Sequence, residues 1–323
     1  MTSDGFDAIV DVHTHLAPPA WQALKRLPPS LLDEGAFVER KRAAGITTSV
    51  VLNAMLNLPG TQMDETTVDS IRRFNEFVQG VAARNHGSIV FFTGANPLAG
   101  EPMLRALEDV LGEPACRGIC VNSSHSGRYL DTPEASEFWA LAEKRGMPVF
   151  VHPPGVPPGA EAVRDFRLVE GVVRAHDTAL GIAALVLGGV LDRHPRLRLI
   201  AATGGGSLAL LRRRLDLLQG RPPGGPPGGA GAGPPALPRP PSSYLDQVYV
   251  DTCVYDPFAL EVVVRAFGAQ RVLFGTDWPP VEIPAAQLID QVRSLPVTVA
   301  ERTAIMGGNA SRLLSLEAST AAG

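Results

Sequence analysis

Ile9-Val10-Asp11-Val12-His13-Thr14-His15-Leu16 is the stretch that decides the fold, because this apolar run ends in two histidines. In an extended strand, residues two apart point to the same side, so the imidazoles of His13 and His15 project from one face. Neutral imidazole is the commonest protein ligand for a divalent metal. The pair therefore predicts half of a metal site. Chance is the alternative, since the chain contains seven histidines.

Seven further apolar runs follow, and segments with helical spacing lie between them. The helical segment 65–84, for example, places Val68, Ile71 and Phe74 on one side. Eight buried strands alternating with helices predict a (β/α)8 TIM barrel in a single domain. An open doubly wound sheet is the alternative, but it would carry a glycine-rich phosphate loop where His-Thr-His stands. The seven runs are 47–52, 89–96, 118–123, 148–152, 197–203, 248–254 and 271–277.

One segment, residues 219–243, does not fit the barrel. It is rich in proline and glycine and lacks core-forming residues, so we expect a disordered surface insertion. The predicted strands before and after this segment together make the eight strands of one barrel, which favours an insertion over an interdomain linker. A proline-rich ligand segment is the alternative, although glycine interrupts any long polyproline run.

The composition excludes several classes of function. The 323 residues are 45% hydrophobic and 19% charged, with a formal net charge of −4 and no long Lys/Arg block, so no nucleic-acid partner is expected. There is no apolar stretch of membrane-spanning length and no signal-peptide pattern, so no membrane partner is expected. The three cysteines have no close pairing, which predicts small core residues in a reducing compartment and hence a cytoplasmic protein.

Chemistry-bearing residues stand at the ends of three predicted strands. The first run carries His13 and His15, the fifth ends in His152, and the eighth ends in Asp277. Active sites of barrels lie at the carboxyl ends of the strands, so these side chains are predicted to meet there. Three imidazoles and a carboxylate suit one divalent ion with room for water. Each residue alone is often structural; together they favour a metal site.

Several motifs carry a family resemblance over nearly the whole chain. They are Val-Asp-Val-His-Thr-His at 10–15, Val-Phe-Val-His-Pro at 149–153, Gly-Gly-Gly at 204–206, Phe-Gly-Thr-Asp-Trp-Pro at 274–279 and Gly-Gly-Asn-Ala-Ser-Arg-Leu-Leu at 307–314. In this order they resemble the amidohydrolase superfamily. More narrowly, they resemble the branch containing aminocarboxymuconate-semialdehyde decarboxylase and γ-resorcylate decarboxylase.

The resemblance implies a distorted barrel with one divalent metal, zinc or alternatively manganese, bound by His13, His15, His152 and Asp277. It implies decarboxylation of a small aromatic or unsaturated carboxylic acid without an organic cofactor; hydrolysis of a C–C, ester or lactone bond is the alternative. Relatives are often dimers, so the resemblance also allows a homodimer. We expect Asp277 to be both a metal ligand and a catalytic proton shuttle.

One position departs from the family pattern. The sixth strand of the family ends in His-Gly-Gly-Gly, whereas this chain has Thr203 before the glycines. A threonine hydroxyl is too weak for acid–base catalysis near neutral pH, although it can hold a water or a substrate oxygen. The missing histidine favours an alternative function, a non-catalytic barrel that keeps the metal for ligand binding.

Two residues beyond the fourth strand complete the predicted site. His125 and Arg128 are expected at its rim, and the guanidinium of Arg128 is a candidate clamp for a substrate carboxylate. A surface ion pair is the alternative for Arg128. Thr203, His125 and Arg128 are thus the predicted substrate-binding residues. The other histidines, His86, His176 and His194, are predicted to be surface or packing residues.

Overall fold

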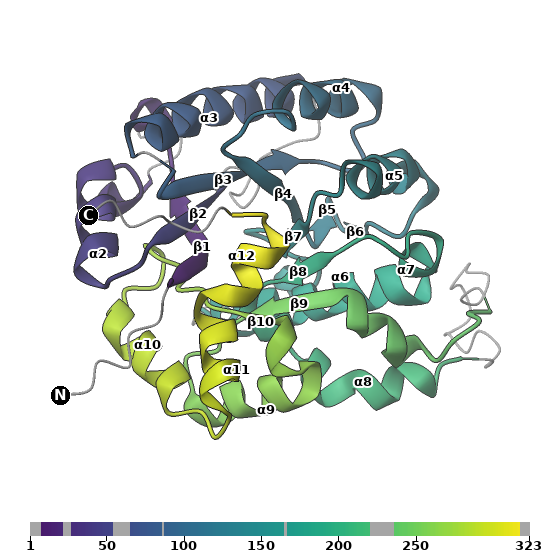
Figure 1. The fold of residues 1–323 in the computed structure, drawn as a ribbon. Coiled ribbons are helices and arrows are strands. Elements are labelled where there is room, and N and C mark those ends of the chain that lie inside the picture. The colour runs from purple at the N-terminus through teal and green to yellow at the C-terminus, as the bar shows by residue number, and fades with distance from the viewer. Residues whose placement is uncertain are drawn as a thin grey trace.

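Eight parallel strands surrounded by helices form the framework of the computed structural model (Figure 1), which describes residues 8–21, 27–53, 65–85, 87–164, 167–219 and 236–316. The strands are neighbours in the order β1-β2-β3-β4-β7-β8-β9-β10, so each large strand pairs with the next one along the chain. Their bounds are β1 (Val10–Leu16), β2 (Thr48–Asn53), β3 (Ile89–Ala95), β4 (Cys116–Asn122), β7 (Val149–His152), β8 (Leu199–Ala201), β9 (Val248–Asp251) and β10 (Val272–Leu273). All eight predicted strands are present.

Hydrogen bonds between the first strand and the segment after the last one close the cylinder. Val12 N donates to Phe274 O (2.9 Å), Asp277 N to His13 O (2.8 Å) and His15 N to Trp278 O (2.8 Å). The predicted barrel is therefore confirmed. The eighth strand is shorter than predicted, because Thr276 N donates to the Asp11 carboxylate (3.0 Å) instead of to a ladder carbonyl.

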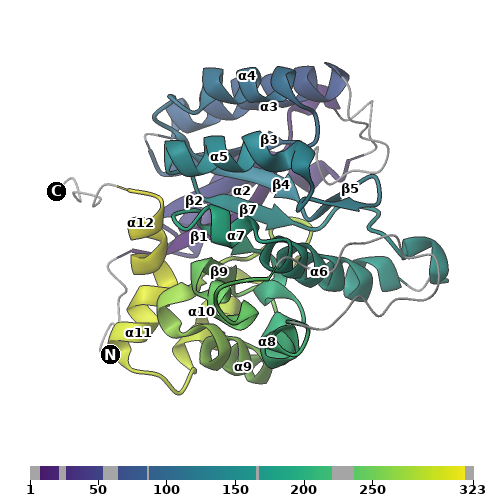
Figure 2. The same ribbon diagram turned by 90° about the vertical axis from the view of Figure 1, so that its right-hand side faces the viewer.

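Helices cover the barrel on all sides; Figure 2 shows α3–α5 on one side and α8–α11 on the other. The predicted helix at 65–84 is α3. A 3₁₀ turn (Pro133–Ala135) leads into α5. The helices are α2 (Glu34–Ala43), α3 (Glu65–Arg84), α4 (Glu101–Val110), α5 (Ser136–Arg145), α6 (Arg174–Leu187), α7 (Val190–Arg193), α8 (Leu208–Asp216), α9 (Pro257–Phe267), α10 (Ala285–Arg293), α11 (Val299–Thr303) and α12 (Asn309–Leu313). None of these helices combines the length and hydropathy needed to cross a bilayer.

Two hydrophobic cores follow from the two faces of the strands. One fills the barrel, with Val12, Phe92 and Phe150 among its buried residues, and the other lies between the sheet and the helices. Helix α12 lies across one end of the barrel (Figure 1), and its Leu313 belongs to the barrel core. Since α12 and the turn before it lie beside Ala8 and the start of β1, they cover the end where the strands begin. The opposite end, where the strands finish, is left for a site.

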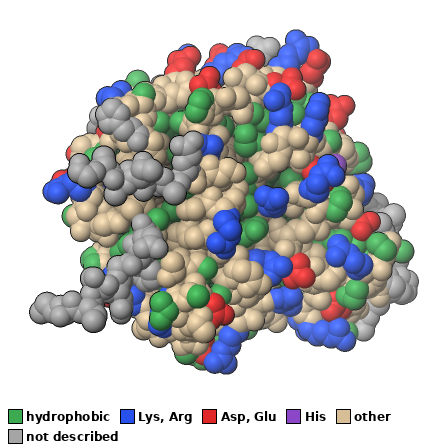
Figure 3. Space-filling model, viewed as in Figure 1, with side chains coloured by type: hydrophobic (Ala, Val, Ile, Leu, Met, Phe, Trp, Pro, Cys, Tyr) green, Lys and Arg blue, Asp and Glu red, His purple; other side chains and the backbone are tan. Residues whose placement is uncertain are grey.

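The predicted insertion at 219–243 lies mostly outside the described residues. Its described ends are held together, since Gln219 Nε2 donates to Leu237 O (2.6 Å) and Ser242 N to Asp216 Oδ1 (2.8 Å). Over the described part of the face in Figure 3, acidic and basic side chains are interspersed.

Candidate metal centre

The four predicted ligands meet at the carboxyl end of the barrel. One donor atom from each of His13, His15, His152 and Asp277 lies within 4.8 Å of the others. The rings of His13 and His152 have centroids 5.1 Å apart, and those of His15 and His152 are 5.3 Å apart. Asp277 Oδ1 is 3.1 Å from His15 Nε2 and 3.3 Å from His13 Nε2. Residues remote in sequence thus form one cluster.

A β-bulge in β1 explains how both histidines of this strand reach the interior. The register runs from Asp11 opposite Ser49 to Thr14 opposite Val51, so two residues of β1 face one of β2. Without a bulge, Val12 and His13 would point to opposite faces; the extra residue re-aims the side chains that follow it. His13 accordingly packs edge-on against Phe150 of the barrel core, at 5.0 Å between ring centroids.

Hydrogen bonds fix the orientation of two imidazoles. His13 Nδ1 is 2.7 Å from Asp251 Oδ2, and His152 Nδ1 is 2.9 Å from Pro153 O. A carboxylate and a carbonyl can only accept, so each Nδ1 carries the proton and each Nε2 has a free lone pair. His13 Nε2 is buried and has no hydrogen-bond partner in the described part of the chain. A carboxylate behind a metal-binding imidazole is a common supporting arrangement, and these residues therefore fit a divalent ion.

Asp251 is itself held rigidly. It is fully buried, and its Oδ1 accepts hydrogen bonds from Gly204 N (2.8 Å) and Cys253 N (3.1 Å). Cys253 is buried, as predicted. It also contacts the candidate centre, because its Sγ lies 3.6 Å from His13 Nδ1. Burial and the nearby carboxylates of Asp251 and Asp277 raise the pKa of the Cys253 thiol well above its ordinary value.

The pKa shifts of His15, His152 and Asp277 favour metal binding, whereas the shift of His13 favours its protonated form, which a metal ion would have to displace. Burial lowers the pKa of His15, and burial together with the other two imidazoles lowers the pKa of His152 much further. Burial opposes protonation of His13 as well, but the carboxylates of Asp277 and Asp251 outweigh it and raise its pKa. Burial would raise the pKa of Asp277, yet the imidazoles of His13 and His15 hold it well below its usual range. Asp277 is therefore an ionised carboxylate at neutral pH.

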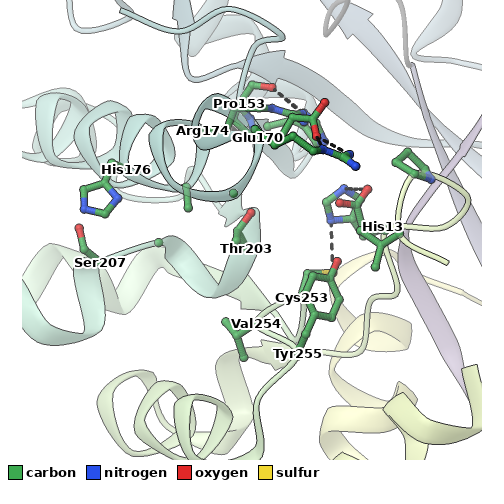
Figure 4. A pocket seen from close by; sticks show the side chains of 18 residues that line it. His13, Pro153, Glu170, Arg174, His176, Thr203, Ser207, Cys253, Val254 and Tyr255 are labelled. Carbon is green, nitrogen blue, oxygen red and sulfur yellow. Dashed lines mark hydrogen bonds and ion pairs between the residues drawn. The ribbon is translucent and has the colours of Figure 1, made fainter. Parts of the chain in front are cut away.

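A cavity of about 710 Å³ opens beside the cluster (Figure 4). It is lined by His13, His152 and Asp277, by the beginning of α6, and by the loops that follow β8 and β9. Its size falls in the range of pockets that enclose small organic ligands. The close approach of two of these elements requires glycine, because a Cβ at Gly206 would lie 2.1 Å from Ala175 O.

The predicted substrate-binding residues separate in the structure. Thr203 lines the cavity. His125 is buried in the small antiparallel pair β5 (Ser124–His125) and β6 (Arg128–Tyr129), and Arg128 is half exposed and paired with Glu134 (2.6 Å). Neither His125 nor Arg128 lines the cavity. The ion pair of Arg128 agrees with the alternative stated for it.

Of the remaining histidines, His176 is exposed at the surface, as predicted. It lies on α6 with its side chain toward Ser207, and it lines the far part of the cavity (Figure 4). His194 pairs with Glu143 (3.2 Å), as expected for a packing residue. His86 is outside the described residues.

Four cavity residues have left-handed backbone conformations. Of the six described non-glycine residues with positive φ, Arg167, Thr203, Tyr255 and Asp277 line the cavity, with φ between 54° and 57°. Such conformations cost about 1–3 kcal/mol each and are concentrated at functional sites, above all when the residue is β-branched or bulky. Left-handed non-glycine residues are therefore concentrated around this cavity, while Ser126 and Ser315 lie elsewhere.

Sequence reasoning missed Asp251, Arg174 and Tyr255. Asp251 ends the seventh strand, and the rule applied to His13, His152 and Asp277 would have found it. Tyr255 stands beside His13 with its ring in the cavity (Figure 4), and burial raises the pKa of its phenol far above the ordinary value. Arg174 lies on a helix far from any motif, so no local pattern pointed to it.

Sequence comparison relates this chain to known proteins. The chain is 24% identical to 2-amino-3-carboxymuconate-6-semialdehyde decarboxylase of Dictyostelium discoideum, over 95% of this chain and 92% of that protein. It is 26% identical to γ-resorcylate decarboxylase of Rhizobium radiobacter, over 91% and 90%.

Solved structures have the same fold. The 5-carboxyvanillate decarboxylase of Sphingomonas paucimobilis superposes with a TM-score of 0.83 at 21% identity, covering 96% of this chain and 99% of that one. A dihydroxybenzoic acid decarboxylase of Polaromonas with bound manganese superposes with a TM-score of 0.78 at 24% identity, covering 96% and 97%. The amidohydrolase family model matches residues 10–316. This chain belongs to the amidohydrolase family.

Proposed function

We propose that this protein is a metal-dependent carboxy-lyase that removes carbon dioxide from a small aromatic or unsaturated carboxylic acid. The observation that carries the proposal is the cluster of three imidazoles and one carboxylate within 4.8 Å, beside a cavity of about 710 Å³. The two relatives compared above are decarboxylases by name, and they match this chain over nine-tenths of its length. The cluster has the residues to hold a divalent metal beside a bound acid, and the names of the relatives indicate decarboxylation as the reaction.

The ligand set we propose is His13, His15, His152 and Asp277. A divalent ion held by these residues would polarise substrate oxygens and stabilise negative charge that develops on them. We propose zinc, since three imidazoles and a carboxylate suit it; manganese, which two of the similar solved structures contain, is the alternative.

The reaction replaces one bond to carbon by another. A proton adds to the carbon that carries the carboxylate, the bond from that carbon to the carboxylate breaks, and its electron pair restores the unsaturated system as carbon dioxide leaves. Overall, one carboxylate and one proton give the decarboxylated product and carbon dioxide. We propose that the Asp277 carboxylate carries this proton to the substrate, since it lines the cavity beside the imidazoles.

Other residues of the cavity position the substrate. Thr203 can donate a hydrogen bond to a substrate oxygen. The raised pKa of Tyr255 keeps its phenol protonated, and its hydroxyl interacts with the Cys253 side chain and makes a long contact of 3.5 Å with Thr276 O. Tyr255 is therefore able to donate a better hydrogen bond to a substrate oxygen.

The test is a carbon dioxide release assay on metal-loaded protein. The panel is 2,6-dihydroxybenzoate, 5-carboxyvanillate and further hydroxybenzoates. We expect turnover of at least one acid and its loss in His152→Ala. His194→Ala is the matched control, because His194 is a packing residue outside the cavity and should leave turnover unchanged. Absence of turnover with every acid would contradict the proposal.

A second candidate is a non-catalytic barrel that captures an acid at the metal. The observation in its favour is Thr203, which replaces the proton-handling histidine of the family pattern. The two functions differ in one measurement: capture alone predicts saturable binding of an acid with no carbon dioxide release above the rate without protein.

Location and assembly are also proposals. We propose a cytoplasmic protein, because all three cysteines are free and buried. We propose a homodimer, because the neighbouring helices α6 and α8 expose Leu180 and Leu210. Light scattering on the purified chain tests the dimer, and a monomeric mass at micromolar concentration would contradict it.

A further inference from the structure

Two arginines line the described part of the cavity, and only one of them is neutralised. Arg167 Nε donates to Glu170 Oε2 at 2.7 Å. Arg174, the first residue of α6, has no carboxylate partner in the described ranges of the chain. One terminal nitrogen of Arg174 makes a 3.5 Å contact with Pro153 O, and its Nε is buried without a hydrogen bond.

The guanidinium of Arg174 has fewer hydrogen-bond acceptors within the chain than it has donors. A guanidinium is always charged and presents five donors in a planar fork, and here one long contact uses one of them. Arg174 is only partly buried, but its Nε is shielded from water without an acceptor, which is costly, so an acceptor from outside the chain would stabilise it. Carboxylates match the fork bidentately, which makes an organic anion the ligand that this position suits best.

Arg174 lies close to the metal ligands. Its charge contributes to the lowered pKa of His15 and of His152. A π-helical turn (Val169–Val173) precedes it, and Gly171, Arg174 and Ala175 form one face that lines the cavity. Figure 4 shows Arg174 and Pro153 on the same side of the cavity, across from Thr203. A molecule bound at the cluster is therefore within reach of the guanidinium.

We propose that Arg174 binds a second anionic group on the substrate, so that the acid decarboxylated here is a dicarboxylate or an equivalent dianion. This inference rests on the proposed function, since it names the class of acid that reacts at the metal.

The reacting carboxylate is a poor partner for Arg174. Its charge disappears as carbon dioxide forms, so a guanidinium bound to it would stabilise the substrate more than the transition state. A second anion that does not react is bound equally in both. Arg174 is thus a substrate-selecting residue, and its loss should raise KM for a dianionic acid with little change in kcat.

The test uses acids that bind without needing to react. Zinc-loaded protein is titrated calorimetrically with benzoate and with phthalate, isophthalate and terephthalate, whose two carboxylates lie at increasing separations. We expect at least one dicarboxylate to bind about tenfold or more tightly than benzoate, as a charge-assisted bidentate pair provides. In Arg174→Met this preference should disappear while benzoate binding stays the same.

Two further variants keep the result interpretable. Arg213→Met removes an exposed arginine of α8 that pairs with Asp216 outside the cavity, and it should retain the full preference. Arg174→Lys keeps the charge without the planar fork and should retain part of the preference for a dicarboxylate. It replaces the methionine variant in the test if that variant does not fold.

The inference is overturned if no dicarboxylate binds more tightly than benzoate to the unaltered protein. It is also overturned if the preference survives in Arg174→Met. Because these titrations measure binding alone, they separate it from the proposed function. A preference that depends on Arg174 without any carbon dioxide release would leave the anion site standing and contradict the lyase.

Discussion

Replacing Asp251 by asparagine should weaken metal binding without changing any ligand. Asp251 Oδ2 accepts the Nδ1 proton of His13 at 2.7 Å, while Oδ1 accepts from Gly204 N and Cys253 N. Asparagine has one acceptor and one donor in place of these two acceptors. Either orientation of the new amide is therefore unfavourable.

The two orientations have different costs. If the amide NH2 faces His13, the imidazole must move its proton to Nε2, and the lone pair that the metal needs is lost. If the NH2 faces the loops, it opposes two backbone N–H groups, each costing about 1–3 kcal/mol when it loses its partner in a buried site. Loss of such a supporting contact typically lowers metal affinity about 10–100-fold, or roughly 1.4–2.7 kcal/mol. We expect Asp251→Asn to fall in that range.

The assay is competition for zinc between the protein and a chelating dye at pH 7.5. Asp177→Asn is the matched control, because Asp177 is equally buried but outside the cavity, and its partners Ser123, Ser124 and Tyr129 are hydroxyls that can reorient toward an amide. The control should keep the zinc affinity of the unaltered protein. Unchanged zinc affinity in Asp251→Asn would refute the role assigned to this carboxylate.

Three other perturbations have distinct expected outcomes. Thr203→His should raise carbon dioxide release about 10²-fold or more, because it restores an acid–base group at a left-handed position where histidine is better tolerated than threonine; an unchanged rate would argue against a decarboxylase that lost this group. Tyr255→Phe should lower kcat while leaving zinc affinity intact, and an unchanged kcat would mean that the hydroxyl touches no reacting substrate. His125→Gln should make the free energy of unfolding less sensitive to acid. Burial lowers the pKa of His125 from 6.5 to about 4 in the folded protein, so the unfolded chain is protonated first as the pH falls. The stability that this residue allows above pH 6.5 is therefore lost as the pH falls toward 4. Urea unfolding at pH 7.5 and pH 4.5 should show that loss, about 3 kcal/mol at 1.36 kcal/mol per pKa unit, in the unaltered protein relative to the variant; equal losses in both would contradict it.

The strand ends were predictable because they follow from local pattern and fold geometry. Apolar runs mark buried strands, and parallel strands in a barrel bring their carboxyl ends together, which is why His152 and Asp277 could be placed beside His13. The bulge in β1 was not predictable, since it depends on the register between β1 and β2. The spacing of His13 and His15 is enough to predict that both lie on the same face of β1. Which face that is, the interior of the barrel, depends on the bulge.

Local sequence patterns do not predict which residues on helices and long loops face the cavity. Arg174 enters the cavity only because a π-helical turn precedes α6 and Gly206 lets the next loop approach that helix closely. His125 and Arg128 were placed at the rim from their position after the fourth strand, but a short hairpin directs them elsewhere. Tertiary packing, which no local pattern encodes, decides which of these side chains faces the cavity.

Elemental analysis of protein purified without added metal shows whether His13, His15, His152 and Asp277 together hold one divalent ion. We expect close to one zinc or manganese ion per chain in the unaltered protein and in His194→Ala, and almost none in His152→Ala. A chain without metal that also fails to bind added zinc or manganese, or a metal content unaffected by His152→Ala, would contradict this expectation.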